Sequence, residues 1–239
     1  MNINRLFRAW CTSLLTMLVV VVVPSVTYAE DALVFGGTGR LGSETVRQLL
    51  TSGYSVAVFA RPGASHGRLD ALDVTYVAGD LLDPDQVAAA FAAVRPQIVI
   101  DASALYSNQH EIEVRHIVAG ARRVGVKRII HHGSVGAGDN MVLFPQVDFT
   151  RLEESLRDKG RAEQVLMDSD IPYVIIRNGS LENNDSKSSG SARLTENVTA
   201  LGPITRRDLA AVTMQCLQGP LCLNNTLHAL DDQLASKTE

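Results

Sequence analysis

The chain has 239 residues, of which 46% are hydrophobic, 20% charged and 5% aromatic, and its formal net charge is −4. A chain of this length and apolar content can bury the core of one globular domain. The charge is slightly negative and no block of lysine and arginine occurs, so nucleic acid is not expected as a partner. The six histidines are scattered and none has chelating spacing, so no metal site is predicted either.

Residues 1–29 are predicted to be a secretory signal peptide. Arg5 and Arg8 form a basic start, and residues 14–23 are a continuous stretch of mostly Leu and Val. Small residues then occupy the positions that define a cleavage site ending at Ala29. The domain is therefore expected to begin after this segment.

An uncleaved membrane anchor is the alternative for this segment. Residues 9–29 carry no charge and are just long enough to span a bilayer. Both interpretations place residues 30–239 outside the cytoplasm, periplasmic or secreted, because the arginines stay inside. A membrane contact is expected only if the segment is not cleaved.

Strand-like and helix-like segments alternate along the rest of the chain. Continuous apolar runs of strand length occur at 32–35, 55–60, 74–78, 98–102, 128–132, 173–177 and about 226–230. Helical segments are expected near 41–52, 83–94, 111–124, 151–169 and 206–218. This alternation predicts a single α/β domain with a doubly wound parallel sheet of about seven strands, of the Rossmann type. The expected strand order is 3-2-1-4-5-6, with the seventh strand following.

A glycine-rich turn joins the first strand to the first helix. Gly36, Gly39 and Gly42 have the spacing of a dinucleotide-binding loop, in the required order of strand, loop and helix. Such glycines allow a tight turn, so that a diphosphate can bind the free N–H groups at the start of the helix. Thr38 and Leu41 belong to the same loop and are predicted to contact the cofactor.

The charges near this loop favour NADP over NAD. NAD-preferring sites place a carboxylate after the second strand, where this chain has Arg61. Arg40 lies within the glycine loop itself. Two guanidinium groups near the adenosine ribose favour a 2′-phosphate, although NAD stays possible.

Two features of the C-terminal half leave alternatives open. The polar stretch 182–191 follows the sixth strand and is either a lid over the substrate or a surface loop. Cys216 and Cys222 flank a Gly-Pro turn. They form either a disulfide or two reduced, buried thiols.

These residues together resemble the atypical short-chain dehydrogenase/reductases, in the NmrA-like and NAD(P)H-binding branch. The segments that carry the resemblance are 36–42, 79–83, 101–104, 132–137, 158–163, 175–179 and 204–210. The resemblance implies that Asp80 and Leu81 border the adenine. It also implies that Ala102 and Ser103 let the cofactor pass over the fourth strand, and that Lys159 holds the nicotinamide ribose.

The catalytic residues that the resemblance implies are incomplete. Conventional members use Ser and Tyr-x-x-x-Lys, and here Ser134 and Lys159 match the Ser and Lys positions. Ser155 stands where the Tyr would be, and no Tyr-x-x-x-Lys occurs in the chain. His132 is the most titratable group expected near the nicotinamide and is a candidate proton donor. Asn178 is expected to face the substrate.

The sequence therefore predicts an NAD(P)-binding protein, and an NADPH-dependent oxidoreductase acting on a small molecule is the favoured function. The missing Tyr keeps a non-catalytic nucleotide sensor or assembly factor as the alternative. Epimerase or dehydratase chemistry is least favoured for the same reason. The oligomeric state does not follow from the sequence.

Overall fold

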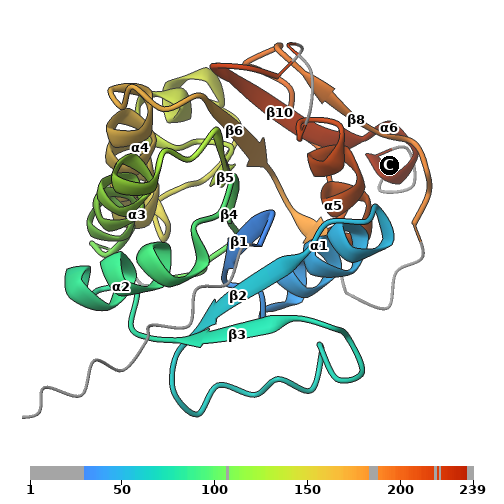
Figure 1. Ribbon diagram of the computed structural model, residues 1–239. Helices are drawn as coiled ribbons and strands as arrows, with labels where there is room; N and C mark the ends of the chain where they lie inside the picture. Colours follow the sequence, from blue (N-terminus) through green and yellow to red (C-terminus); the bar gives the residue numbers. More distant parts are fainter. Residues whose placement is uncertain (1–29, 106–107, 183–187, 218–219, 221, 236–239) are drawn as a thin grey trace, which may run out of the picture.

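An eight-stranded sheet forms the centre of the molecule (Figure 1). The computed structural model describes residues 30–105, 108–182, 188–217, 220 and 222–235, so the predicted signal segment lies outside the described residues. The strand order is β3-β2-β1-β4-β5-β6-β10-β8. The strands are β1 (Ala32–Phe35), β2 (Val56–Ala60), β3 (Thr75–Ala78), β4 (Ile98–Asp101), β5 (Arg128–Ser134), β6 (Tyr173–Asn178), β8 (Ala192–Thr195) and β10 (Asn225–Asp231).

Helices cover both faces of this sheet (Figure 1). One face packs against α1 (Arg40–Thr51) and α5 (Arg206–Met214). The other face packs against α2 (Pro84–Val94), α3 (His110–Val124) and α4 (Glu153–Met167). A 3-10 helix, η1 (Gly138–Leu143), follows β5, and the short α6 (Asp232–Ala235) follows β10.

The two cores follow from the alternation of side chains along each strand. In β1, Ala32 and Val34 face the α1 and α5 side, whereas Leu33 and Phe35 face α2 and α3. All four are fully buried, as expected for a parallel strand that is covered on both faces. The predicted α/β architecture is confirmed. The predicted strand order, 3-2-1-4-5-6 followed by a seventh strand, is also confirmed, and β10 is that seventh strand.

The prediction of about seven strands misses an edge strand. Strand β8 pairs with β10 in the antiparallel direction and makes the eighth strand of the sheet. It has four residues and is only partly buried, so its apolar pattern is too weak to be read from the sequence. A separate pair is formed by β7 (Leu181–Glu182) and β9 (Ile204–Thr205).

The described end of the polar stretch 182–191 is anchored to the domain. Ser188 donates a hydrogen bond to Asp208, and the Ser189 hydroxyl donates one to Asp231. The Ser189 backbone N–H also donates to Asp208 at 3.1 Å. Residues 183–187, on which the lid interpretation also depends, lie outside the described residues.

Cys216 and Cys222 form a disulfide, with their Cα atoms 5.3 Å apart. Both residues are buried. The bond joins the chain just after α5 to the segment that leads into β10. Of the two alternatives from the sequence, the disulfide is the one observed.

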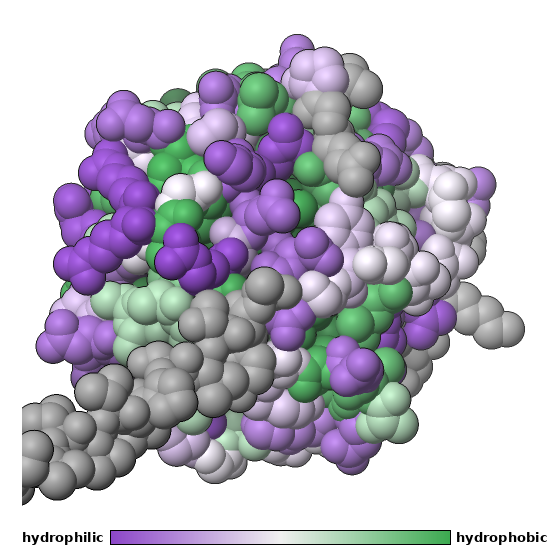
Figure 2. Space-filling view, in the orientation of Figure 1, coloured by the Kyte–Doolittle hydropathy of each residue, from purple (hydrophilic) through white to green (hydrophobic). Residues whose placement is uncertain are grey.

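Within the described residues, which begin at Glu30, no helix has the length and apolar character needed to cross a membrane. Figure 2 shows polar side chains over much of one face, with smaller apolar areas between them.

Candidate cofactor and active site

A cleft of about 670 Å³ lies at the carboxyl edge of the sheet. Ligands bind at this edge in doubly wound folds, and the volume is typical of a small-molecule site. With the exception of Gly42, every residue predicted for the site lines the cleft: Gly36, Thr38, Gly39, Arg40, Leu41, Arg61, Asp80, Leu81, Ala102, Ser103, His132, Ser134, Lys159 and Asn178. The sequence therefore located the residues of one continuous cavity.

The glycine loop places the start of α1 at this cleft. Helix α1 begins at Arg40, and no side chain in the described structure caps its first turn. By contrast, α2 is capped by the Asp83 carboxylate and α5 by the Thr205 hydroxyl. The first N–H groups of a helix lack partners within the helix. The start of α1 is therefore available to bind an anion.

The glycines are required by close backbone contacts. A Cβ at Gly42 would lie 2.2 Å from the Gly36 carbonyl oxygen, and Gly36 itself has φ +72°. A Cβ at Gly36 would lie 2.4 Å from the Ala102 carbonyl oxygen. Gly42 therefore closes the turn from behind the cleft, and Gly36 brings the turn against the end of β4.

The predicted adenosine side combines free cations with one carboxylate. Arg40 and Arg61 are exposed, and their guanidinium groups make no hydrogen bond or ion pair with any described residue. Asp80 lines the cleft and accepts a hydrogen bond from the Leu82 N–H at 2.9 Å. Asp80 thus has the turn-forming contact of an ordinary loop carboxylate while it also faces the predicted adenine position.

Ser134 and Asn178 lie side by side at the opposite end of the cleft. They are register partners at the ends of β5 and β6. The Ser134 hydroxyl donates to the Val135 carbonyl at 3.2 Å, and the Asn178 amide donates to the Gly179 carbonyl at 3.0 Å. Both are weak local contacts that a ligand can replace.

His132 is buried in the wall of the same end, and its ring is neutral at pH 7. Burial is the main cause that lowers its pKa to about 4, and the nearby His131 adds to the effect. Its Nε2 lies 3.4 Å from the Thr213 hydroxyl. A histidine with this pKa is not in its acidic imidazolium form near neutral pH, so His132 is a weak candidate for the proton donor.

Lys159 reaches the cleft from α4, whose position is fixed by a contact between glycines. A Cβ at Gly160 would lie 2.3 Å from the Gly138 Cα, so only glycine allows this approach. Burial lowers the pKa of Lys159, although the nearby carboxyl groups of Glu113, Glu163 and Asp101 oppose the shift. A buried amine with a lowered pKa can exchange a proton more readily than an exposed lysine.

A buried polar network behind the cleft was not predicted from the sequence. Ser103 in the cleft wall donates to Glu113 at 2.7 Å, and His110 Nδ1 lies 3.1 Å from the other oxygen of Glu113. Burial raises the pKa of Glu113 to about 9, and the charge of Asp101 adds to the shift. Glu113 is therefore an uncharged acid at neutral pH.

Asp101 and His131 form the charged part of this network. Their side chains lie 2.8 Å apart and are almost fully buried. Burial opposes both charges, but the hydrogen bond and the mutual attraction lower the pKa of Asp101 and raise that of His131. Asp101 and His131 are register partners in the neighbouring strands β4 and β5. In the sequence, the signal for this pair was one polar residue in each of two otherwise apolar strands.

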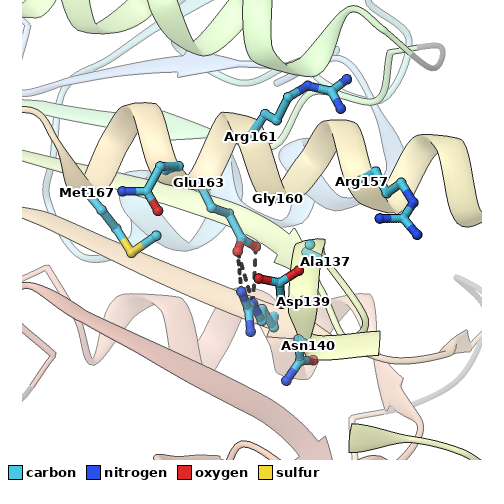
Figure 3. Close-up of a pocket in the computed structure, with 11 residues that line it drawn as sticks. Ala137, Asp139, Asn140, Arg157, Gly160, Arg161, Glu163 and Met167 are labelled. Carbon is cyan, nitrogen blue, oxygen red and sulfur yellow. Dashed lines mark hydrogen bonds and ion pairs between the residues drawn. The ribbon is translucent and has the colours of Figure 1, made fainter. Parts of the chain in front are cut away.

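A second hollow, of about 440 Å³, lies beside α4 and η1 (Figure 3). Its inner wall holds the ion pair of Arg177 and Glu163, in which Arg177 Nη2 lies 2.5 Å from Glu163 Oε2. Arg161 points away from this pair in Figure 3 and binds Glu111, and Arg157, farther along the same helix, binds Glu153. These charged side chains already have partners, so the cleft with the glycine loop is the better candidate site.

Comparison with known proteins agrees with this assignment. A model of the NAD(P)H-binding family matches residues 36–220, which include the glycine loop and most of the sheet. The chain belongs to this family. NAD(P)H binding is thus established at the level of the family, and the atypical short-chain reductase resemblance is confirmed.

The alignments with individual relatives cover different shares of the chain. The NAD(P)H azoreductase of Xenophilus azovorans is 27% identical over 194 residues, which are 79% of this chain and 63% of that protein. Sterol demethylase protein B of Methylococcus capsulatus is 34% identical over 117 residues, 44% of this chain and 34% of that protein. The chain therefore spans between about a third and two thirds of the length of these curated relatives.

Among solved structures, the chain is similar to ChuY, an anaerobillin reductase from Escherichia coli O157:H7. The two share 26% sequence identity with a TM-score of 0.76. The match covers 85% of this chain and 98% of ChuY. A structure from Veillonella parvula in complex with NADP has a TM-score of 0.70 at 16% identity, which shows the common fold alone.

Proposed function

We propose that this protein is an NAD(P)-dependent oxidoreductase that prefers NADPH and reduces a small organic acceptor. The observation that carries the proposal is the glycine loop at the cleft, in a chain whose family binds NAD(P)H. Two of its relatives are named as reductases, an azoreductase and an anaerobillin reductase.

The preference for NADPH rests on charge in the cleft. Arg61, directly after β2, lines it, and its guanidinium group has no partner among the described residues. Free guanidinium groups bind a phosphate through charge-assisted hydrogen bonds. No carboxylate follows β2 to repel the 2′-phosphate of NADP.

At the predicted nicotinamide end of the cleft, Lys159 can act as the proton donor in place of the missing tyrosine. Reduced nicotinamide, when bound, supplies a hydride. Lys159 has its amine in the cleft wall and a lowered pKa, so its ammonium form can donate a proton to the reduced acceptor. Ser134 and Asn178 can orient the acceptor through their hydroxyl and amide groups.

Nucleotide binding and turnover test this proposal separately. Binding is measured from the fluorescence of NADPH and NADH, with little interference because Trp10 is the only tryptophan. Turnover is measured as NADPH oxidation with azo, quinone, flavin and tetrapyrrole acceptors. Binding of NADPH without turnover on any acceptor would support a nucleotide sensor instead, and absence of binding would refute both functions.

Lys159→Met tests the proton donor. We expect kcat to fall by about 100-fold, in the range that general acid catalysis contributes, with a smaller change in the Kd for NADPH. The wild-type rate should decline as pH rises through the lowered pKa of Lys159, because the donor must be protonated. A Lys159→Met variant with unchanged kcat would assign the proton to water.

We further propose that the protein is exported. The N-terminal sequence has the composition of a signal peptide, and a disulfide between Cys216 and Cys222 is consistent with an oxidising compartment. Amino-terminal sequencing of the purified protein checks this. A start near Glu30 supports cleavage, and a start at Met1 refutes it.

A further inference from the structure

Arg206 lines the cofactor cleft, but neither the glycine loop nor the choice of coenzyme gives it a role. It is the first residue of α5 and is half-buried. Its Nη1 donates a hydrogen bond to the Glu182 carbonyl at 2.5 Å. This contact uses one of its five donors and leaves its positive charge facing the cleft.

Arg40 and Arg206 line the same cleft from the first residues of α1 and α5, two helices that pack against each other. Burial lowers the pKa of Arg206, and the positive charge of Arg40 lowers it further. In the described structure, no carboxylate forms an ion pair with either guanidinium. Two cations that face one cleft without a counterion are unfavourable, and an anion bound between them would remove the repulsion.

The topology indicates which anion fits this position. Arg61 follows β2, which pairs with β1 on one side. Arg206 follows β9, whose partner β7 continues from β6, on the other side of β1. Arg40 stands at the start of α1 between these two positions. A dinucleotide that runs from the β2 side to the β6 side crosses the start of α1 with its diphosphate.

We infer that Arg40 and Arg206 bind the diphosphate of the nucleotide from two sides, whereas Arg61 faces the 2′-phosphate alone. This inference rests on the proposed function, because it assumes that a dinucleotide occupies the cleft. The diphosphate is common to NADH, NADPH and ADP. Loss of Arg206 should therefore weaken all three ligands alike.

Neighbouring Arg207 provides a matched control. It begins the same helix turn, but it is exposed and lies 3.4 Å from Glu44 on α1. Arg206→Gln and Arg207→Gln each remove one positive charge from nearly the same place in the chain. A general effect of net charge would therefore appear equally in both variants.

The experiment compares the affinities of ADP, adenosine, NADH and NADPH for the full chain and both variants by calorimetry. We expect Arg206→Gln to weaken ADP, NADH and NADPH by about 10- to 100-fold, as for loss of hydrogen bonds to a charged group. Adenosine should bind equally to all proteins, and Arg207→Gln should change each affinity by less than about twofold.

Three results would overturn the inference. A loss confined to NADPH would assign Arg206 to the 2′-phosphate. Unchanged nucleotide affinities with a higher KM for an acidic acceptor would assign it to the substrate. Equal losses in Arg206→Gln and Arg207→Gln would show only a long-range charge effect.

Two further comparisons keep the test decisive. If the wild-type protein binds no nucleotide, the proposed function fails, whereas normal binding by both wild type and Arg206→Gln refutes the inference alone. If thermal melting shows that Arg206→Gln does not fold, Arg206→Lys replaces it. Lysine keeps the charge but loses the planar fork. It should weaken ADP at least about threefold and leave adenosine unchanged, and unchanged ADP affinity would overturn the inference.

Discussion

Glu113 is the buried group whose replacement should change stability most strongly with pH. Its pKa is raised from 4.5 to about 9. Between pH 4.5 and about pH 9, the Glu113 carboxyl is ionised in the unfolded chain but protonated in the folded protein. Ionisation of the unfolded state therefore reduces the stability of the folded protein by about 1.4 kcal/mol per pH unit above pH 4.5. At pH 7 the cost is about 3 kcal/mol, from 2.5 pH units.

Glutamine at position 113 should remove this cost and keep the same contacts. The protonated acid accepts from Ser103 at 2.7 Å and has a donor for His110 Nδ1 at 3.1 Å. His110 is neutral at pH 7, because burial lowers its pKa to about 4. An amide has the same pattern of one acceptor and one donor group. Glu113→Gln should therefore be more stable than wild type by up to about 3 kcal/mol at pH 7.

Urea unfolding of both proteins between pH 5 and pH 9 measures this difference. The other titrating groups are present in both proteins, so their contributions largely cancel. The advantage of the variant should be small at pH 5 and should grow steadily as pH rises. Parallel stability curves would refute the reasoning, because they would mean that Glu113 is ionised in the folded protein.

Glu111→Gln is the control on the same helix. Glu111 is partly exposed and binds Arg115 and Arg161. The hydrogen bond from Arg115 is the main cause that lowers its pKa. Its contribution to stability is present above the unfolded pKa and is lost as pH falls. The variant should therefore be less stable at neutral pH, by no more than about 1 kcal/mol.

Three further substitutions test the glycine loop, the coenzyme preference and the disulfide. Gly42→Ala should weaken NADPH by at least about 10-fold in fluorescence titration, because its Cβ would lie 2.2 Å from the Gly36 oxygen. Gly67→Ala is its control, with 3.7 Å to the nearest atom, and equal effects of the two would contradict the role of the loop. Arg61→Gln should weaken NADPH by about 10-fold and leave NADH unchanged, whereas an equal loss for both would remove the argument for NADPH. Cys216→Ser should lower the free energy of unfolding by about 2 kcal/mol, the entropic value for a loop closed across six positions, and added reductant should then no longer affect the melting temperature.

The continuous apolar strands and the glycine spacing made the fold and the cleft predictable. All segments of the resemblance except 158–163, which lies on α4, are found where a strand ends. Parallel strands bring those ends to one edge of the sheet, so residues as distant as Gly36 and Asn178 share one cavity. These positions could be predicted from the local sequence because each needs a small, polar or basic side chain at a strand end.

The buried network and the role of Arg206 were less accessible. Glu113 lies on a helix where a charged residue is normally solvated, and only its packing against Ser103 shows that it is buried. The sequence contained Arg206 within a matching segment, but its approach to Arg40 depends on how α5 packs on α1. Side-chain environment of this kind depends on tertiary packing and not on periodicity.

The geometry of α4 also has a consequence for redesign. Ser155 stands one helical turn before Lys159, so the two side chains share one face of the helix. The approach of Gly160 to Gly138 holds that turn in place. The helical spacing of the conventional phenol–amine pair is therefore kept, and Ser155→Tyr alone would restore the Tyr-x-x-x-Lys pattern on this helix.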